Sequence, residues 1–84
     1  MTVLELSKVS QTHMKIMSSY NGKVLCHRFD PEKHKEIGER EVISVWADLC
    51  IVKGPFGDSA KAIIRCYAYG GEEYRAEHPE YTEV

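Results

Sequence analysis

Hydrophobic and polar residues alternate most clearly in the second half of the chain. In the segments 41–53 (EVISVWADLCIVK) and 58–69 (DSAKAIIRCYAY), apolar residues occupy almost every second position. A period of two is typical of a β-strand with one buried face. The segment 54–57 (GPFG) lies between them and has the glycines and proline of a tight turn. The pattern therefore predicts a hairpin of two long antiparallel strands.

The length of the turn sets the register of this hairpin. A four-residue loop over 54–57 places Lys53 opposite Asp58, and every cross-strand pair on one face is then apolar. A slip of one residue would bring Lys61 and Arg65 onto that face, so the pattern selects this register. We predict that the apolar face is the core side of the sheet. Its pairs are Ile51–Ala60, Leu49–Ala62, Ala47–Ile64, Val45–Cys66 and Ile43–Ala68.

A second hairpin is predicted in the first half of the chain. The segments 12–19 and 23–29 flank Asn21-Gly22, and Asn-Gly is the preferred centre of a type I′ turn because both residues tolerate a positive φ. One face of this hairpin is mainly apolar. The expected pairs are Met14–Phe29, Ile16–His27 and Ser18–Leu25.

Two further segments have weaker signals. Residues 2–8 alternate weakly and are predicted to form an edge strand. Asp30 is a good N-cap, Pro31 fits the first helical position and Gly38 is a suitable stop, so a short helix is expected near residues 31–37.

These elements predict a mostly β protein: a small five-stranded antiparallel sheet, curled or closed into a barrel, with one short helix. A two-layer α+β fold, with a helical segment covering one face of the sheet, is the alternative. The length of 84 residues indicates one domain. We expect a β-rich domain over residues 1–70 and an acidic tail over residues 71–84.

Charge is distributed unevenly, which limits the classes of partner. Residues 1–69 carry ten Lys and Arg against eight Asp and Glu, whereas residues 70–84 carry one Arg against five Glu. The formal net charge of −2 gives no support for strong nonspecific binding to nucleic acid. Three cysteines at long spacings do not resemble a secreted disulfide framework. Without a signal-peptide pattern or a long apolar run, the expected location is the cytoplasm.

The segment 25–34 (LCHRFDPEKH) gathers Cys, His and carboxylates within ten positions. Neighbouring side chains of a strand point to opposite faces, so Cys26 and His27 cannot both reach one metal ion. The paired ligand spacing of zinc sites is missing. Cys66 falls on the expected core face, where a thiol is inert. No catalytic residue, metal site or cofactor is predicted.

The second face of the long hairpin carries the more informative chemistry. Trp, Tyr and Arg are the side chains most enriched at the energetic centres of protein interfaces. The same side chains on a sheet also stack single-stranded bases. Packing within the fold is the competing explanation for this face. The candidate residues are Trp46, Asp48, Lys61, Arg65, Tyr67 and Tyr69.

The acidic tail is a secondary candidate. It is expected to be a solvated terminus, and the functional alternative is an arm that docks on a basic surface of a partner. Its candidate residues are Glu72, Glu73, Tyr74, Glu77 and Tyr81.

The sequence therefore favours a small non-catalytic binding or accessory protein that acts through protein–protein contact, including self-association as a homodimer. Its size is also typical of phage and mobile-element proteins. A single-stranded nucleic-acid-binding small barrel is the second hypothesis. A metal-dependent or thiol enzyme is the third.

Overall fold

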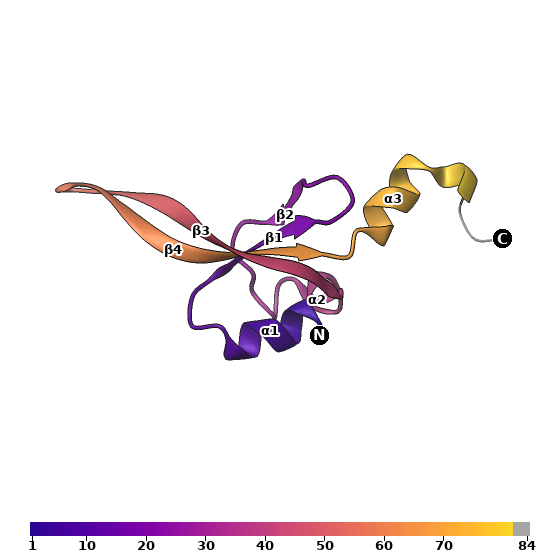
Figure 1. Ribbon diagram of the computed structural model, residues 1–84, viewed down its shortest axis with the longest axis horizontal. Helices are drawn as coiled ribbons and strands as arrows, with labels where there is room; N and C mark the ends of the chain where they lie inside the picture. The colour runs from indigo at the N-terminus through magenta and orange to yellow at the C-terminus, as the bar shows by residue number, and fades with distance from the viewer. Residues whose placement is uncertain (82–84) are drawn as a thin grey trace.

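The computed structural model describes residues 1–81, with side chains for residues 1–80 (Figure 1). The chain forms a four-stranded sheet with strand order β2-β1-β4-β3 and several short helices. Strand β1 runs parallel to β4, while the two outer pairs are antiparallel. In chain order the elements are α1 (Val3–Val9), β1 (Met14–Ser18), β2 (Val24–Cys26), α2 (Lys35–Gly38), β3 (Val42–Gly54), β4 (Gly57–Ala68), α3 (Gly71–Glu77) and the 3₁₀ turn η1 (Pro79–Tyr81).

The mostly β prediction is confirmed, but the five strands and the closed barrel are wrong. The sheet within the described residues is open and mixed. Helices α1 and α2 lie together on one side of it (Figure 1), an arrangement closer to the two-layer alternative.

The missing fifth strand is helix α1. The Glu5 backbone N–H donates to Thr2 Oγ1 over 3.2 Å, and the Thr2 backbone N–H donates to Glu5 Oε1 over 2.9 Å. This reciprocal pair is a capping box, which satisfies two amide donors that a helix start would otherwise leave unpaired. Val3, in the first turn, is fully buried. The Thr-x-x-Glu spacing therefore indicates the helix that forms, whereas the weak alternation over residues 2–8 wrongly predicts a strand.

The core is built around the central strand β1. Its Ile16 has no exposed surface and pairs with Cys26 on one side and with Cys66 on the other. Helix α1 and the chain before α2 cover this face. The buried hydrophobic cluster consists of Val3, Met14, Ile16, Cys26, Phe29, Cys66 and Ala68.

The β1–β2 hairpin agrees with the prediction at Met14, whose carbonyl accepts from the Phe29 N–H over 2.8 Å, but departs from the predicted register at Ile16. Ile16 pairs with Cys26, not with His27. Of the two turn residues, only Gly22 has a positive φ, of 71°, so the type I′ turn, which needs both, does not form. The Gly22 N–H instead donates to the Ser18 carbonyl over 2.9 Å, which makes a longer loop. Cys26 therefore enters the core and His27 is exposed.

The predicted helix over residues 31–37 is also displaced. Asp30 Oδ1 accepts from the Glu32 N–H over 2.9 Å, and the Asp30 carbonyl accepts from the His34 N–H over 2.8 Å. Asp30 thus caps a turn rather than a helix, and α2 begins four residues beyond Pro31, at Lys35.

The register of the long β3–β4 hairpin is confirmed from the Val45–Cys66 pair to the Lys53–Asp58 pair. At its inner end, a bulge at Ile43 pairs Val42 with Ala68, so the predicted Ile43–Ala68 pair is wrong. The bulge turns Ile43 outward, where 57% of its surface is exposed.

The prediction that the apolar face is core along its whole length is wrong for the outer half of both strands and also for the inner part of β3, where Val45 is 47% exposed. Only the inner part of β4, with Cys66 and Ala68, is buried. Strand β1 has five residues and pairs with β4 only from Met14–Ile64 to Ser18–Ala68. Beyond the Met14–Ile64 pair, residues 48–63 project as a two-stranded hairpin, here called the arm (Figure 1). On the arm, Leu49 is 66% and Ile51 is 62% exposed. Alternation alone does not reveal how far the covering layer extends.

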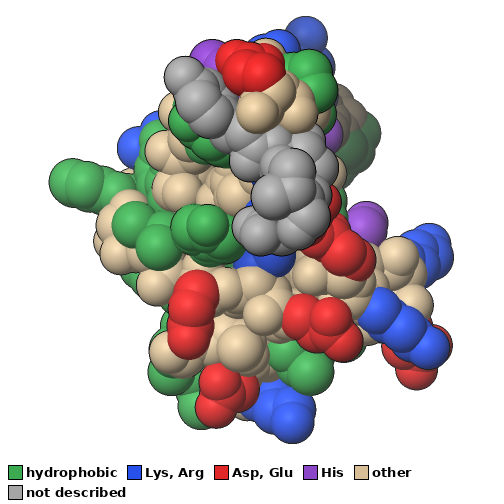
Figure 2. All heavy atoms as spheres, turned by 90° about the vertical axis from the view of Figure 1, so that its right-hand side faces the viewer, with side chains coloured by type: hydrophobic (Ala, Val, Ile, Leu, Met, Phe, Trp, Pro, Cys, Tyr) green, Lys and Arg blue, Asp and Glu red, His purple; other side chains and the backbone are tan. Residues whose placement is uncertain are grey.

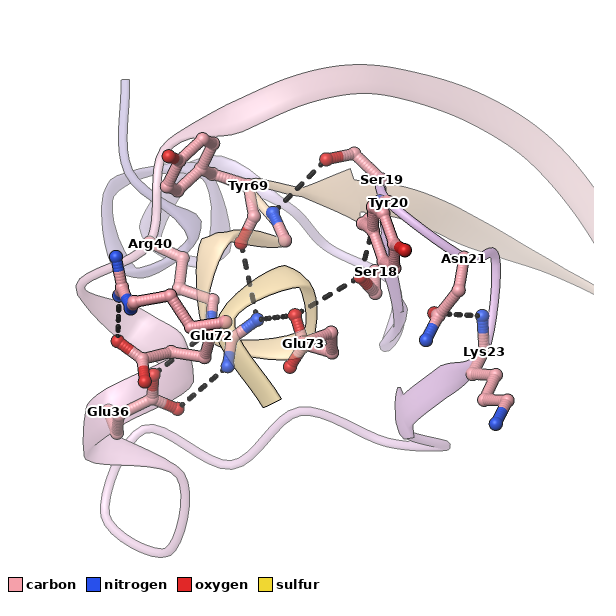
Figure 3. Close-up of polar contacts among 12 residues, drawn as sticks. Ser18, Ser19, Tyr20, Asn21, Lys23, Glu36, Arg40, Tyr69, Glu72 and Glu73 are labelled. Carbon is pink, nitrogen blue, oxygen red and sulfur yellow. Dashed lines mark hydrogen bonds and ion pairs between the residues drawn. The ribbon is translucent and has the colours of Figure 1, made fainter. Parts of the chain in front are cut away.

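Helix α3 is joined to the body by a partly buried ion pair (Figure 3). Arg40, only 10% exposed, donates to Glu73 Oε2 over 2.8 Å and to Glu36 Oε1 over 3.0 Å. Glu73 also accepts from the Ser18 hydroxyl over 3.1 Å. At Gly70, a Cβ atom would lie 2.4 Å from Ser18 Oγ, so the close approach of α3 requires glycine there. The start of the expected tail is thus a docked helix, and residues 82–84 lie outside the described structure.

We predict that Glu73→Gln weakens the docking of α3 by about 1–3 kcal/mol, because a hydrogen bond between charged groups is lost. Hydrogen bonding and charge from Arg40 lower the pKa of Glu73 below its ordinary 4.5. A lowered carboxyl pKa stabilises docking above pH 4.5, and this stabilisation is lost as the pH falls through the lowered value. The rings of Tyr20 and Tyr74 are in contact when α3 is docked, with centroids 5.3 Å apart. NMR detection of this contact across a pH series therefore measures docking as a function of pH.

The matched control is Glu72→Gln. Glu72 is exposed and pairs with Arg75 within the helix, so its removal is expected to cost under about 1 kcal/mol. Equal effects of the two substitutions would contradict the assigned role of Glu73.

Candidate partner-binding face on strands β3 and β4

The candidate face lies on the sheet surface opposite α1 and α2, where the arm joins the body. Trp46 on β3 pairs directly with Arg65 on β4, and Ser44 pairs with Tyr67. These residues alternate with the buried Cys66 on β4 and with Val45 on β3, so they lie on the face opposite Cys66 and the core. A shallow depression of about 370 Å³ forms here. It is lined by Ser19, Ile43, Ser44, Trp46, Arg65 and Tyr67.

Trp46 is exposed over 56% of its surface, although it is the largest side chain of the protein. Its indole Nε1–H donates to Ser44 Oγ over 3.3 Å. This bond holds one edge of the ring while the rest faces solvent. Packing within the fold, the competing explanation for this face, therefore does not apply to Trp46.

Arg65 has unused hydrogen-bonding capacity. Its Nε atom is buried but has no hydrogen-bond partner among the described residues. The nearest carboxylate oxygen, Asp48 Oδ2, is 3.8 Å away, which is an ion pair but too far for a hydrogen bond. The guanidinium also lies 5.8 Å from the centre of the Tyr67 ring, within the range of a cation–π contact. Asp48 and Tyr67 therefore orient Arg65 without saturating it.

The structure brings together four of the six predicted face residues: Trp46, Asp48, Arg65 and Tyr67. Lys61 is on the same side but pairs with Cys50 on the arm, about 13 Å along the strand from Arg65. Tyr69 lies beyond the end of β4, and its ring packs beside Gly71 at the start of α3. Lys61 and Tyr69 are thus separate from the group.

Sequence reasoning missed Ile43 and Ser19 as members of this face. Ile43 was assigned to the core side, and only the bulge at this position turns it outward. Ser19 arrives from the loop after β1, because the Ser19 N–H donates to the Ala68 carbonyl over 2.8 Å. No local sequence signal reports a bulge or a contact between segments fifty residues apart.

The end of the molecule opposite the arm is rich in acidic side chains (Figure 2). A second depression there, of about 580 Å³, is lined by four glutamates and two arginines. Arg40 is occupied by Glu36 and Glu73, and Arg75 pairs with Glu72. The residues that line this depression are Glu36, Glu39, Arg40, Glu41, Ile43, Tyr69, Glu72 and Arg75.

The predicted tail residues divide between internal contacts and solvent. Glu73 is engaged with Arg40 and Ser18, so it is not free to meet a partner. The Tyr74 ring packs against Tyr20 and His78. Glu77 is exposed. The side chain of Tyr81 lies outside the described part of the structure.

The described residues, 1–81, were predicted to contain neither a metal site nor a reactive thiol, and the positions of their His, Cys and acidic side chains are as follows. No group of three or more His, Cys, Asp or Glu side chains within that range is arranged to hold a metal ion. Burial raises the pKa of the Cys26 thiol and raises that of Cys66 to about 11. A thiol with such a pKa is almost entirely protonated at neutral pH and is a poor nucleophile.

Comparison with protein-family models, with curated proteins and with solved structures yields no match for this chain. Within the described residues, no helix is long and apolar enough to cross a bilayer. Function must therefore be inferred from the geometry of the face itself.

The exposure of Trp46 predicts its fluorescence. As the single tryptophan of the chain, it is expected to emit at the long wavelengths of a solvated indole and to be quenched efficiently by acrylamide. A short-wavelength emission maximum with weak quenching in the native protein would contradict the exposed position.

The three cysteines are predicted to react at different rates. Cys50 is partly exposed, whereas Cys26 and Cys66 are buried. Under native conditions at neutral pH, a thiol reagent should modify Cys50 first, and modification of the other two should wait for unfolding. Mass spectrometry after timed alkylation, with Cys50→Ser as the control, checks the order. Rapid labelling of Cys66 in the folded protein would refute it.

Proposed function

We propose that this protein is a non-catalytic binding protein that engages a protein partner through the Trp46–Arg65–Tyr67 face. The observation that carries this proposal is the exposed Trp46 ring beside Arg65, whose side chain is 34% exposed. An exposed aromatic ring next to an accessible guanidinium is the combination most enriched at the energetic centres of protein interfaces.

The chemistry of the face indicates what the partner presents. Trp46 and Ile43 offer apolar surface, and the exposed part of the Arg65 guanidinium offers charge-assisted donors. A backbone carbonyl or a carboxylate placed over Arg65, with an apolar side chain against Trp46, satisfies both. Ser19 and Ser44 at the border add hydroxyl groups for polar contacts. An apolar centre with polar groups at its border is the usual anatomy of a protein interface.

Single-stranded nucleic acid is the second candidate. Trp46 and Tyr67 are aromatic side chains on a sheet with Arg65 between them, a combination that stacks bases and contacts phosphate. Asp48 lies beside Arg65, and the net charge is −2. Both oppose the approach of a phosphate backbone, so the protein partner is favoured.

We predict that peptides selected from a random display library for binding to the wild-type protein lose affinity for Trp46→Ala by about 30-fold or more, as expected at an interface hot spot. Arg65→Ala should weaken the same peptides, most of all those carrying a carboxylate. Isothermal titration calorimetry with synthetic peptides measures the change.

Tyr69→Ala is the matched control, because Tyr69 is 55% exposed, about as much as Trp46, but lies outside the face. Peptides that bind Trp46→Ala as tightly as the wild type would contradict the proposal. If an oligothymidylate instead binds in a salt-dependent manner that Trp46→Ala abolishes, the nucleic-acid candidate replaces it.

A further inference from the structure

The described part of the chain leaves most of the arm uncovered; the exception is Ile63, which is 7% exposed and pairs with Asp48 at the base of the arm. Its two strands pair with each other over residues 48–63, and no other described strand pairs with either of them there. An isolated two-stranded hairpin is at best marginally stable in water. Native proteins usually protect such edges with charges, prolines or bulges. Between Leu49 and Val52 the edge strand β3 has none of these.

One face of the arm, here called the apolar arm face, continues the core side of the sheet. It consists of Leu49, Ile51, Ala60 and Ala62. Leu49 and Ile51 are 66% and 62% exposed. Large β3 side chains stand opposite small β4 side chains, so the face has a ridge and a shallow groove. Within the protein itself, side chains of α1 and α2 pack over β1 and the inner part of β4, whereas Val45 on β3 remains 47% exposed.

The charge on this face is compatible with a second copy of itself. The charged residues at its outer end are Lys53 and Asp58, which pair across the strands. The face is therefore neutral overall, and two copies brought together meet no net repulsion.

We infer that two copies of this protein associate by packing their apolar arm faces together, antiparallel, about a two-fold axis near Ile51. In this arrangement each arm continues the covering layer that α1 and α2 begin on the other copy. An antiparallel orientation is required, because with parallel arms the α1–α2 layers of both copies would occupy the same space. The contact is isologous, as in most homodimers.

The length of the arm fits this arrangement. Phe56, at the tip, lies five positions from Ile51 in one direction, and Trp46 lies five positions in the other, about 16 Å each way. The tip of one copy therefore reaches the edge of the body of the other. Phe56 is fully solvent-exposed in the single chain, at 102%.

A hollow is present at that edge. It has a volume of about 130 Å³ and lies where the chain passes from α1 into β1. A cavity of about 150 Å³ accommodates a benzene ring, so the hollow matches a phenyl side chain in scale. We assign it as the seat of Phe56 from the second copy. Its lining residues are Ser7, Thr12, His13, Met14, Phe29 and Pro31.

The area of contact sets the expected strength. Two strands about 30 Å long and 10 Å wide bury about 300 Å² on each copy. Stable dimers bury about 800 Å² per partner. Even with the two Phe56 contacts added, the association should depend on concentration and populate the dimer only at high protein concentration.

Analytical ultracentrifugation from about 1 µM to about 1 mM, the range in which such an interface is populated, tests the inference. The wild type is expected to shift from monomer to dimer. Leu49→Lys and Ile51→Lys should each remain monomeric, and Phe56→Ala should raise the dissociation constant about tenfold. Because Leu49, Ile51 and Phe56 are exposed, folding should be unaffected, which circular dichroism verifies.

Val52→Lys is the matched control. Val52 is 43% exposed, belongs to the same strand and points to the other face of the arm, so its variant should dimerise like the wild type. Trp46→Ala should also dimerise normally, which separates this inference from the proposed partner face. A wild type that stays monomeric at about 1 mM would overturn the inference and leave the arm face to a different partner. A dimer abolished by Val52→Lys or Trp46→Ala, but not by Leu49→Lys, would also overturn it.

Discussion

The difference in length between the central strand and the strands beside it determines the shape of this protein. Strand β1 has five residues, whereas β3 and β4 have 13 and 12. Helices α1 and α2 form their layer over the part of the sheet that β1 completes, around the fully buried Ile16. Beyond Met14, the first residue of β1, no third strand pairs with β4 in the described structure, and the β3–β4 hairpin continues as two strands. A buried core and an exposed apolar arm are thus consequences of one mismatch in strand length.

The two ends of the molecule are stabilised by different interactions. At one end, Arg40 and Glu73 form a partly buried ion pair that also engages Ser18, and this connects three segments far apart in the chain. Such a pair gives orientation more than net stability, because removing both charges from water is costly. At the other end, the arm exposes the apolar side chains of Leu49 and Ile51 to solvent. At the acidic end, the charges of Arg40 and Glu73 are paired within the chain. On the arm, the apolar side chains would be buried only by association with another molecule.

Both proposed contacts use the same hairpin but opposite faces of it. Successive residues of β3 point to opposite sides, so Trp46 belongs to the partner face while Leu49 belongs to the apolar arm face. A dimer formed through the arms would leave both Trp46 faces accessible and would present them as a pair. Two linked sites raise the apparent affinity for a partner that carries two copies of the recognised group. Weak self-association and binding are in this way compatible within a chain of 84 residues.

The sequence by itself determined the register of the long hairpin, because a slip of one residue would place Lys61 and Arg65 among the apolar side chains. It also contained the signal for α1 in Thr2 and Glu5, although the alternation over residues 2–8 obscured it, and it placed Trp46 opposite Arg65. Tertiary structure decided the rest. The extent of the covering layer, the bulge at Ile43 and the one-residue shift that buries Cys26 depend on contacts between distant segments. A periodic pattern reports which face of a strand is apolar, but only the packed chain decides how much of that face is covered.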